Sequence, residues 1–387
     1  MKEGWEYKKL GEVTTAINGL WTGKKPPFIN VAVVRNTNFT KDCKLDMTNI
    51  AYLDVEQKQY TTRKLHPGDI IIEKSGGSDK QPVGRPVLFD IAEGEFSFSN
   101  FTSTLRINDL NVLFPKFLHY TLFDVYLRGD TFKMQSKTTG IHNLDFKAYN
   151  RLLIPIPPLS EQQRIVEELD LLSSIIEKKK AQLKELDSLA QSIFYDMFGD
   201  NNYEIVTLGE VVEIKSTLVS PTDLPYSEML HVSPSNIISN VGSIVDCVKA
   251  KEESLISGKY TFSKGMILYS KIRPNLNKVA IPNFDGICSA DMYPLSIKGK
   301  VNSIFIWRLL LSKGFLEYAI KHSGRARMPK LNREALFAYR FPLPPLPLQQ
   351  QFAEKVEAIE HQKEMIKQSI KEVETLINSR MDYYFDG

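Results

Sequence analysis

The sequence contains one internal duplication, and this feature constrains the fold most, because a missed repeat leads to a wrong architecture. Three pairs of segments match in the same order along the chain: 10–13 with 208–211, 65–72 with 262–269, and 154–163 with 341–350. The first pair is separated by 198 positions and the last by 187, so the second copy is 11 residues shorter between these landmarks. Two copies of about 190 residues indicate a duplicated domain pair, because a solenoid stacks at least about three much shorter units.

Each copy ends in a segment that predicts a long helix. The first begins at Ser160, followed three residues later by Gln163, which is the sequence signature of a capping box. In the second copy Pro347 takes the place of the serine, and proline is tolerated in a first helical turn. Segments 160–198 and 347–385 have no internal proline or glycine, and each holds 39 residues. This length corresponds to roughly 58 Å of helix at about 1.5 Å per residue.

Apolar residues in both segments alternate spacings of four and three, which is the pattern of a coiled-coil seam. The expected seam residues are Ile165, Leu169, Leu172, Ile176, Leu183, Leu186, Phe352, Val356, Ile359, Ile366, Ile370 and Val373. Lys179, Lys363 and Arg380 interrupt the pattern, and we expect the two lysines to set the register. The simplest arrangement pairs the two helices of one chain antiparallel. A symmetric homodimer through the same seams is the alternative.

Positive charge is concentrated outside these helices. The chain has 49 Lys and Arg residues against 46 Asp and Glu, a formal net charge of +3. Residues 1–159 carry +4 and residues 199–346 carry +5, whereas residues 160–198 and residues 347–387 carry −3 each. This asymmetry is expected if the globular parts face a polyanion, although a solvated surface could also produce it.

Both copies have polar loops that are rich in basic and amide side chains. In the first copy the candidate DNA-binding residues are Lys24, Lys25, Arg35, Asn36, Asn38, Lys74, Ser75, Lys80, Arg85, Thr138, Thr139, His142 and Asn143. In the second copy they are Ser235, Asn236, Lys271, Arg273, Asn275, Asn277, Lys278, Arg325, Arg327 and Lys330. Lys and Arg contact phosphates or guanine edges, and Asn reads adenine. For any one of these residues, a solvated turn is the alternative.

The pattern between the loops predicts a mixed α/β fold with two similar domains. Short β-branched and aromatic runs at 29–34 and 87–89 are typical of strands, and a helical stretch at 114–126 matches another at 304–318. We therefore expect a first domain over 1–159, a spacer helix over 160–198, a second domain over 199–346 and a second spacer helix over 347–387.

No catalytic or metal-binding motif stands out in the sequence. Neither a phosphate-binding loop, nor a dinucleotide fingerprint, nor a nucleophile elbow is present, and the six histidines have no metal-ligand spacing. The segment 25–28, Lys-Pro-Pro-Phe, lacks the Asn of the amino-methyltransferase motif that it resembles. A nuclease site built from scattered Asp, Glu and Lys residues stays open.

The chain has no feature of an exported or membrane protein. Its first residues lack the apolar core of a signal peptide, and no apolar run reaches the roughly 18 residues that a membrane span needs. Cys43, Cys247 and Cys288 are far apart and form no CxxC pair. We therefore expect a cytoplasmic protein without a membrane partner, metal or disulfide framework.

The doubled Pro-Pro-Leu-x-x-Gln-Gln helix start at 157–163 and 344–350 carries a family resemblance, together with the strands 68–72 and 265–268 and the loop 270–275. These features resemble the specificity subunit of type I restriction–modification systems over essentially the whole chain. The resemblance implies two target-recognition domains, each reading half of a bipartite site in double-stranded DNA. It also implies an antiparallel coiled coil that spaces the domains and docks two methyltransferase (modification) subunits, with restriction subunits joining them.

The resemblance implies a non-catalytic chain without a cofactor of its own. S-adenosylmethionine would sit on the methyltransferase subunit, and ATP and Mg²⁺ would be used by the restriction subunit. Two readers docked on one face of DNA favour half-site centres about 10 bp apart, with helix length acting as a ruler. Two other functions stay open, namely a self-contained nuclease or methyltransferase with an unrecognised site, and a coiled-coil scaffold without a DNA role.

Overall fold

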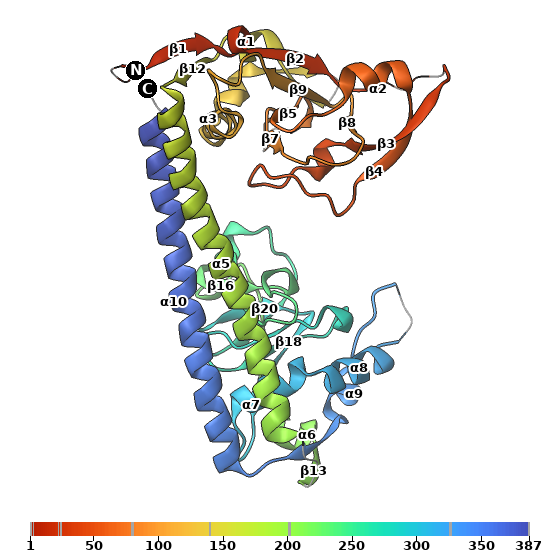
Figure 1. The fold of residues 1–387 in the computed structure, drawn as a ribbon. Helices are drawn as coiled ribbons and strands as arrows, with labels where there is room; N and C mark the ends of the chain where they lie inside the picture. Colours follow the sequence, from red (N-terminus) through yellow and green to blue (C-terminus); the bar gives the residue numbers. More distant parts are fainter. Residues whose placement is uncertain are drawn as a thin grey trace. The chain divides into compact units, whose positions relative to one another are not determined.

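The computed structural model describes residues 2, 4–21, 23, 25–78, 81–138, 141–199, 203–324 and 327–385. The chain divides into two compact units, which are described separately here (Figure 1). Unit 1 comprises Met1–Lys178 with Ser369–Gly387, and unit 2 comprises Lys179–Gln368. The division falls within both long helices, so each unit contains a part of each helix.

The strands of unit 1 form a central four-stranded antiparallel sheet, in the order β2-β9-β5-β7, and three smaller sheets, β4-β3-β8, β10-β11-β6 and β1-β12. Every residue of the inner strand β5 is buried, so the central sheet is the middle of the core. The strands are β1 Glu6–Lys9, β2 Thr14–Asn18, β3 Phe28–Val34, β4 Ala51–Glu56, β5 Asp69–Glu73, β6 Ser75–Gly77, β7 Pro86–Phe89, β8 Phe96–Phe98, β9 Thr102–Ile107, β10 Gln135–Thr138, β11 Ile141–Leu144 and β12 Leu153–Ile156.

Helix α3, Pro115–Leu127, packs against the central sheet of unit 1. Its buried Phe117, Leu118 and Leu122 share a hydrophobic core with Ile70 and Leu105 of the sheet. The helices that precede the first long helix are α1 Leu10–Val13, α2 Gln57–Arg63, α3 Pro115–Leu127 and α4 Phe146–Tyr149, with short 3₁₀ turns η1 Asn36–Asn38 and η2 Asp130–Met134. The predicted strands at 29–34 and 87–89 and the predicted helix at 114–126 are confirmed within one residue.

Unit 2 repeats the central antiparallel sheet as β14-β21-β18-β19, and adds the sheets β15-β17-β20-β16 and β13-β22. Its strands are β13 Glu204–Thr207, β14 Val212–Glu213, β15 Leu218–Val219, β16 Leu230–Val232, β17 Lys259–Phe262, β18 Ile267–Ser270, β19 Val279–Ala280, β20 Gly286–Ser289, β21 Met292–Ile297 and β22 Arg340–Leu343. Its short helices are α6 Leu208–Val211, α7 Ser303–Leu311, α8 Lys313–His322 and α9 Arg333–Phe337, with 3₁₀ turns η3 Tyr226–Glu228, η4 Pro234–Asn236, η5 Ala250–Glu252 and η6 Pro274–Leu276.

The helical stretch predicted at 304–318 is two helices. Ser312 ends α7 and begins α8, and its Oγ accepts a hydrogen bond from Phe315 N at 3.3 Å. The serine caps the second helix, which satisfies a backbone N–H that a continuous helix would bond internally. The periodicity of apolar residues does not reveal this break, because both helices face the same core.

The two units share corresponding backbone contacts, which confirms the duplication. Leu10 N donates to Leu152 O in unit 1, and Leu208 N donates to Tyr339 O in unit 2, both at 2.8 Å. Before the inner strand of each central sheet, Gly68 and Gly265 adopt positive φ angles of 96° and 85°. A side chain at either position would be strained, so glycine recurs there. The mixed α/β prediction with two similar domains is confirmed.

The long helices are α5 Leu159–Phe198 and α10 Leu346–Phe385, which lie side by side in each unit (Figure 1). Every predicted seam residue is buried or half-buried. In unit 1, Arg164 Nη2 donates to Tyr384 Oη at 3.3 Å, and Arg380 Nη2 donates to Glu168 Oε2 at 3.0 Å. As the chain advances along α5, the residues that it contacts in α10 come earlier in the sequence, so the two helices run in opposite directions. The expected antiparallel pairing of two helices of one chain is confirmed for unit 1.

Unit 2 has the same antiparallel pairing between the end of α5 and the start of α10. The ring of Phe352 lies 5.6 Å from that of Phe194 and 5.1 Å from that of Phe198, measured between centroids. Further along α10, Lys363 Nζ lies 2.7 Å from Asp187 Oδ1. Among the described helices, none is long and apolar enough to cross a membrane.

The repeated Pro-Pro-Leu-x-x-Gln-Gln motif is explained by a buried glutamine. Gln162 is 0% exposed, and its Nε2 donates to the carbonyls of Pro157 and Val112, both at 2.8 Å. Its Oε1 accepts from Phe114 N at 2.8 Å, the residue that precedes α3. In unit 2, Gln349 repeats two of these contacts, because its Nε2 donates to Pro344 O at 2.6 Å and its Oε1 accepts from Asn302 N at 2.9 Å.

The structure also corrects the capping box predicted at Ser160. Helix α5 begins at Leu159, so Ser160 lies inside the first turn and not at the capping position. The motif therefore repeats because Gln162 joins α5 to the start of α3, and Gln349 joins α10 to the start of α7. These bonds do not involve Ser160, so the proline at the equivalent position of the second copy leaves them intact.

Candidate nucleic-acid interface

In unit 1 the predicted loops around Lys74 and Asn143 lie next to each other. Strand β6 pairs antiparallel with β11, and Leu144 N donates to Lys74 O at 2.8 Å. Ser75 Oγ donates to Asn143 Oδ1 at 2.6 Å. Two polar loops that are about 70 residues apart in sequence therefore lie side by side.

In unit 2 the same backbone pairing brings together the loops around Arg273 and Lys330. Leu331 N donates to Lys271 O at 2.8 Å, which corresponds to the Leu144–Lys74 bond of unit 1. Arg273 N donates to Pro329 O at 2.8 Å, and Ile272 forms an isolated β-bridge with Lys330. The two loops thus pair with each other in each unit.

The turn that presents Arg273 and Asn275 has an unusual backbone. Arg273 and Asn277 adopt left-handed φ angles of 47° and 46° on either side of η6. Asn277 is 5% exposed, and its Nδ2 donates to Leu311 O at 3.0 Å and to Asn240 Oδ1 at 3.2 Å. Left-handed backbone at Arg is uncommon and persists where the surroundings hold it. The turn keeps the side chains of Arg273 and Asn275 exposed, as Arg327 and Lys330 are.

Each paired loop also contains a half-buried lysine at the same structural position. Burial lowers the pKa of Lys74, whose Nζ donates to Asn18 Oδ1 at 3.3 Å. Burial also lowers the pKa of Lys271, with Lys330 adding to the effect and Asp291 opposing it. An approaching phosphate stabilises a partly desolvated ammonium more strongly than a fully hydrated one. Sequence reasoning missed Asn18 and Asp291, because neither lies near its lysine in the chain.

Two predicted DNA contacts, Asn38 and Asn236, hold turns from the inside. Their side chains are 2% and 9% exposed. Asn38 Oδ1 accepts from Arg35 N at 3.0 Å, and its Nδ2 donates to Asp46 O at 3.1 Å. Asn236 makes the same pattern with Ser233 N at 2.9 Å and Val245 O at 3.1 Å. Both asparagines follow the 198-residue offset of the first repeat landmark, a signal that could have marked them as shared framework.

Burial sorts the remaining candidates. Like Asn38, Asn236 and Asn277, the side chains of Arg85 and His142 are buried, so contact with DNA would require a rearrangement. The exposed candidates are Lys25, Ser235, Arg273, Asn275, Arg327 and Lys330. The half-buried candidates are Arg35, Asn36, Lys74, Ser75, Asn143, Lys271 and Lys278. Lys24, Lys80, Thr139 and Arg325, and the side chain of Thr138, lie outside the described part of the chain.

The thiols within the described ranges are held in their protonated form. Burial raises the pKa of Cys247 to about 11 and that of Cys43 and Cys288 to about 12, so all three are protonated at neutral pH. A thiol in that state is a poor nucleophile. In the described part of the chain, no three His, Cys, Asp or Glu side chains are grouped as metal ligands.

Comparison with known proteins identifies a family for both halves of the chain. The model of the family "type I restriction modification DNA specificity domain" matches residues 2–187 and again 200–375. The EcoDI specificity subunit of Escherichia coli is 28% identical over 328 residues, which cover 74% of this chain and 73% of that protein. The EcoKI specificity subunit of Escherichia coli K12 is 31% identical over 198 residues, covering 49% of this chain and 40% of that protein.

Two solved structures share the fold. A chain of a type I R-M system, from work on complex assembly and conformational transition, superposes with a TM-score of 0.57 at 18% identity and covers 100% of this chain and 98% of that one. The S subunit from M. genitalium gives a TM-score of 0.50 at 15% identity, over 98% of this chain and 96% of that one. With two matched domains that span most of its length, the chain belongs to the family of type I restriction–modification DNA specificity subunits.

Proposed function

We propose that each unit reads one half of a bipartite DNA target through its paired loops, and that the chain docks modification and restriction subunits. One observation supports this above the others. The same backbone pairing joins Lys74 to Leu144 and Lys271 to Leu331, yet the neighbouring side chains differ between the units, with Asn143 in one and Lys330 in the other. A shared frame with different side chains suits two readers of different sequences.

In this proposal the chain itself is not catalytic and carries no cofactor. The modification subunits, two per chain, would bind S-adenosylmethionine and methylate adenine, and the restriction subunits would use ATP and Mg²⁺. A base inside a duplex must be flipped out before it is methylated, and that task would fall to the modification subunit. The names of the relatives, which describe subunits of restriction enzymes, support this division of labour.

The test removes two exposed charges from the unit 2 loops. Arg273→Ala combined with Lys330→Ala is compared with Lys264→Ala combined with Lys300→Ala. The control pair is also exposed, but it lies at the other end of β18 and β21, because Ile267 pairs with Leu295 there and Ser270 pairs with Met292 near the loops. Each complex is assembled with its modification subunit, and methylated adenines are mapped across the genome.

We expect the loop variant to lose or relax one half of the recognised motif and the control variant to keep both halves. Binding should also become less salt-dependent, because each lost phosphate contact lowers the slope of log affinity against log salt by about 1. Identical motifs and identical salt slopes for the two variants would refute the assignment of these loops. A purified chain that cuts or methylates DNA without partners would refute its non-catalytic role.

A further inference from the structure

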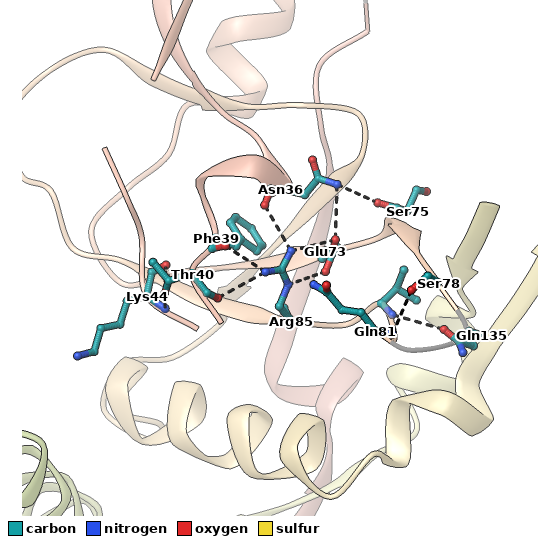
Figure 2. Close-up of polar contacts among 11 residues, drawn as sticks. Asn36, Phe39, Thr40, Lys44, Glu73, Ser75, Ser78, Gln81, Arg85 and Gln135 are labelled. Atoms are coloured by element: carbon teal, nitrogen blue, oxygen red, sulfur yellow. Dashed lines mark hydrogen bonds and ion pairs between the residues drawn. The ribbon is translucent and has the colours of Figure 1, made fainter. Parts of the chain in front are cut away.

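Arg85, a predicted DNA contact, has all of its donors occupied inside unit 1. Its Nε donates to Glu73 Oε2 at 2.8 Å, and its Nη2 donates to Glu73 Oε1 at 3.2 Å. Nη1 donates to the carbonyls of Phe39 and Thr40 at 3.0 and 3.5 Å, and Nη2 also donates to Asn36 O at 3.4 Å (Figure 2). A guanidinium has five N–H groups, so none is left for a phosphate or a base.

The carbonyls that Arg85 binds belong to the turn that presents Arg35 and Thr37. Asn36 contributes a second link, because its Nδ2 donates to Glu73 Oε1 at 3.5 Å and to Ser75 O at 3.4 Å. The turn is therefore attached to the end of β5 and to the start of β6, the strand that pairs with the Asn143 loop (Figure 2). Through Glu73, Arg85 joins this turn to the paired loops of unit 1.

The far end of the same loop is anchored independently. Cys43 O lies 3.1 Å from Nε2 of His119 on α3, and Lys44 Nζ donates to Oε1 of Glu177 on α5 at 3.1 Å. Loop 35–44 therefore has fixed points on the sheet and on two helices of unit 1. The points at the turn itself are the Glu73–Arg85 pair and the Asn36 side chain, and both of them meet at Glu73.

Unit 2 has a cation in the equivalent place. Glu73 N donates to Arg85 O at 3.0 Å, and Ser270 N donates to Lys278 O at 3.0 Å, which makes Lys278 the counterpart of Arg85 and Ser270 that of Glu73. Lys278 Nζ donates to Pro234 O at 2.6 Å, and Pro234 begins η4 as Asn36 begins η1. A basic side chain thus binds the first carbonyl of the 3₁₀ turn in both units, which is a structural role common to two different readers.

We propose that the buried Glu73–Arg85 pair positions the turn 35–40 and thereby determines which half-site unit 1 reads. This inference rests on the proposed function, because it takes the turn to face DNA. Arg85 is in this view a positioning residue that never touches DNA. Its planar fork holds three carbonyls, whereas the single ammonium of Lys278 holds one, so the unit 1 turn depends more on this contact.

The test variant is Arg85→Lys, which keeps the charge and removes the fork. The matched control is Arg106→Lys, because Arg106 makes a comparable two-bond pair with Asp69 at the other end of β5, at 2.8 and 2.7 Å. Arg106 Nη2 also donates to Lys64 O at 2.9 Å, a bond that does not reach the turn. Both full-length variants are assembled with the modification subunit and mapped for methylated adenines, with hydrogen exchange measured on the same complexes.

For Arg85→Lys we expect at least a tenfold loss of discrimination at the unit 1 half-site, an unchanged unit 2 half-site, unchanged affinity for non-specific DNA, and faster exchange confined to residues 36–46. Arg106→Lys should leave both half-sites intact. If Arg85→Lys does not fold, Glu73→Gln, which keeps the side-chain volume, should show the same confined loss. The proposal is wrong if discrimination is unchanged, if Arg106→Lys shows the same loss, or if affinity falls equally on all DNA, as removal of a phosphate contact would cause. A wild-type complex that methylates no defined motif would instead refute the proposed function.

Discussion

Four charged side chains of unit 2 give the most quantitative prediction, which concerns Glu360→Ala; Asp187 lies on α5, Glu360 and Lys363 lie on α10, and Arg308 lies on α7. Glu360 Oε1 accepts from Arg308 Nη2 at 2.7 Å, and Glu360 Oε2 lies 2.9 Å from Lys363 Nζ. Asp187 Oδ1 lies 2.7 Å from the same Nζ. Arg308 and Lys363 are each 2% exposed. Removing Glu360 leaves two buried cations with Asp187 as the carboxylate that remains in this cluster.

The expected cost follows from burial. Removing one partner of a buried ion pair destabilises a protein by roughly 3–5 kcal/mol, because the remaining charge is desolvated and uncompensated. The side chain of Glu360 is 34% exposed, so water can enter the space that it leaves. We therefore expect the lower end, about 3 kcal/mol, which corresponds to a roughly 150-fold change in the local opening equilibrium.

The assay is hydrogen exchange on the full-length chain, read in peptides from 303–311 and 346–368. The control is Glu357→Ala, which removes an exposed carboxylate one turn earlier on α10. Adding Lys363→Leu to Glu360→Ala should recover most of the protection, because leucine suits the apolar seam and removes one of the two cations. Equal protection in Glu360→Ala and Glu357→Ala would refute the reasoning, as would a lack of recovery in the double variant.

Three further predictions follow from the helices and the unit 1 core. Inserting one heptad into α5 alone should lengthen the non-contacted spacer of the recognised site or abolish binding; an unchanged spacer in methylation mapping would contradict the ruler hypothesis. Gln162→Ala and Gln349→Ala should each lower the free energy of unfolding by about 2–3 kcal/mol, because buried hydrogen-bonding groups lose their partners; the exposed neighbours Gln163→Ala and Gln350→Ala should be near neutral in thermal unfolding. Burial lowers the pKa of His119 to about 4, so the unfolded chain binds a proton first as pH falls. Stability should therefore drop by about 2 kcal/mol between pH 6.5 and pH 4, and His119→Asn should flatten that part of the pH–stability curve, whereas an unchanged curve would show that this histidine is not involved.

The duplication and the long helices could be predicted from sequence, because both depend on local patterns. The four–three spacing of apolar residues begins at Ile165 in the first long helix and recurs in the second, up to Val373. This spacing is a property of the chain alone, and so is the repeated helix start. The sequence did not decide between pairing within one chain and a homodimer. The contacts of Glu168 with Arg380, and of Asp187 with Lys363, show pairing within the chain in each unit.

The candidate interface could be predicted only as a set of loops. Basic residues are exposed on the loops at Arg273 and Lys330, but basic and amide residues also hold turns from within, as Arg85 and Asn38 do. The difference depends on partners that are distant in the structure and unremarkable in the sequence. Glu73 is such a partner, because nothing in a buried strand of isoleucines shows that its last residue will bind Arg85.

The most direct test of the central claim is a methylated-adenine map of cells that express this chain with its modification subunit, compared with cells that express the Arg273→Ala, Lys330→Ala variant. We predict one bipartite motif with a spacer of constant length for the wild type. In the variant, the half that unit 2 reads should be relaxed or lost while the other half is unchanged. A single undivided motif, or a variant in which both halves change together, would contradict the assignment of one half-site to each unit.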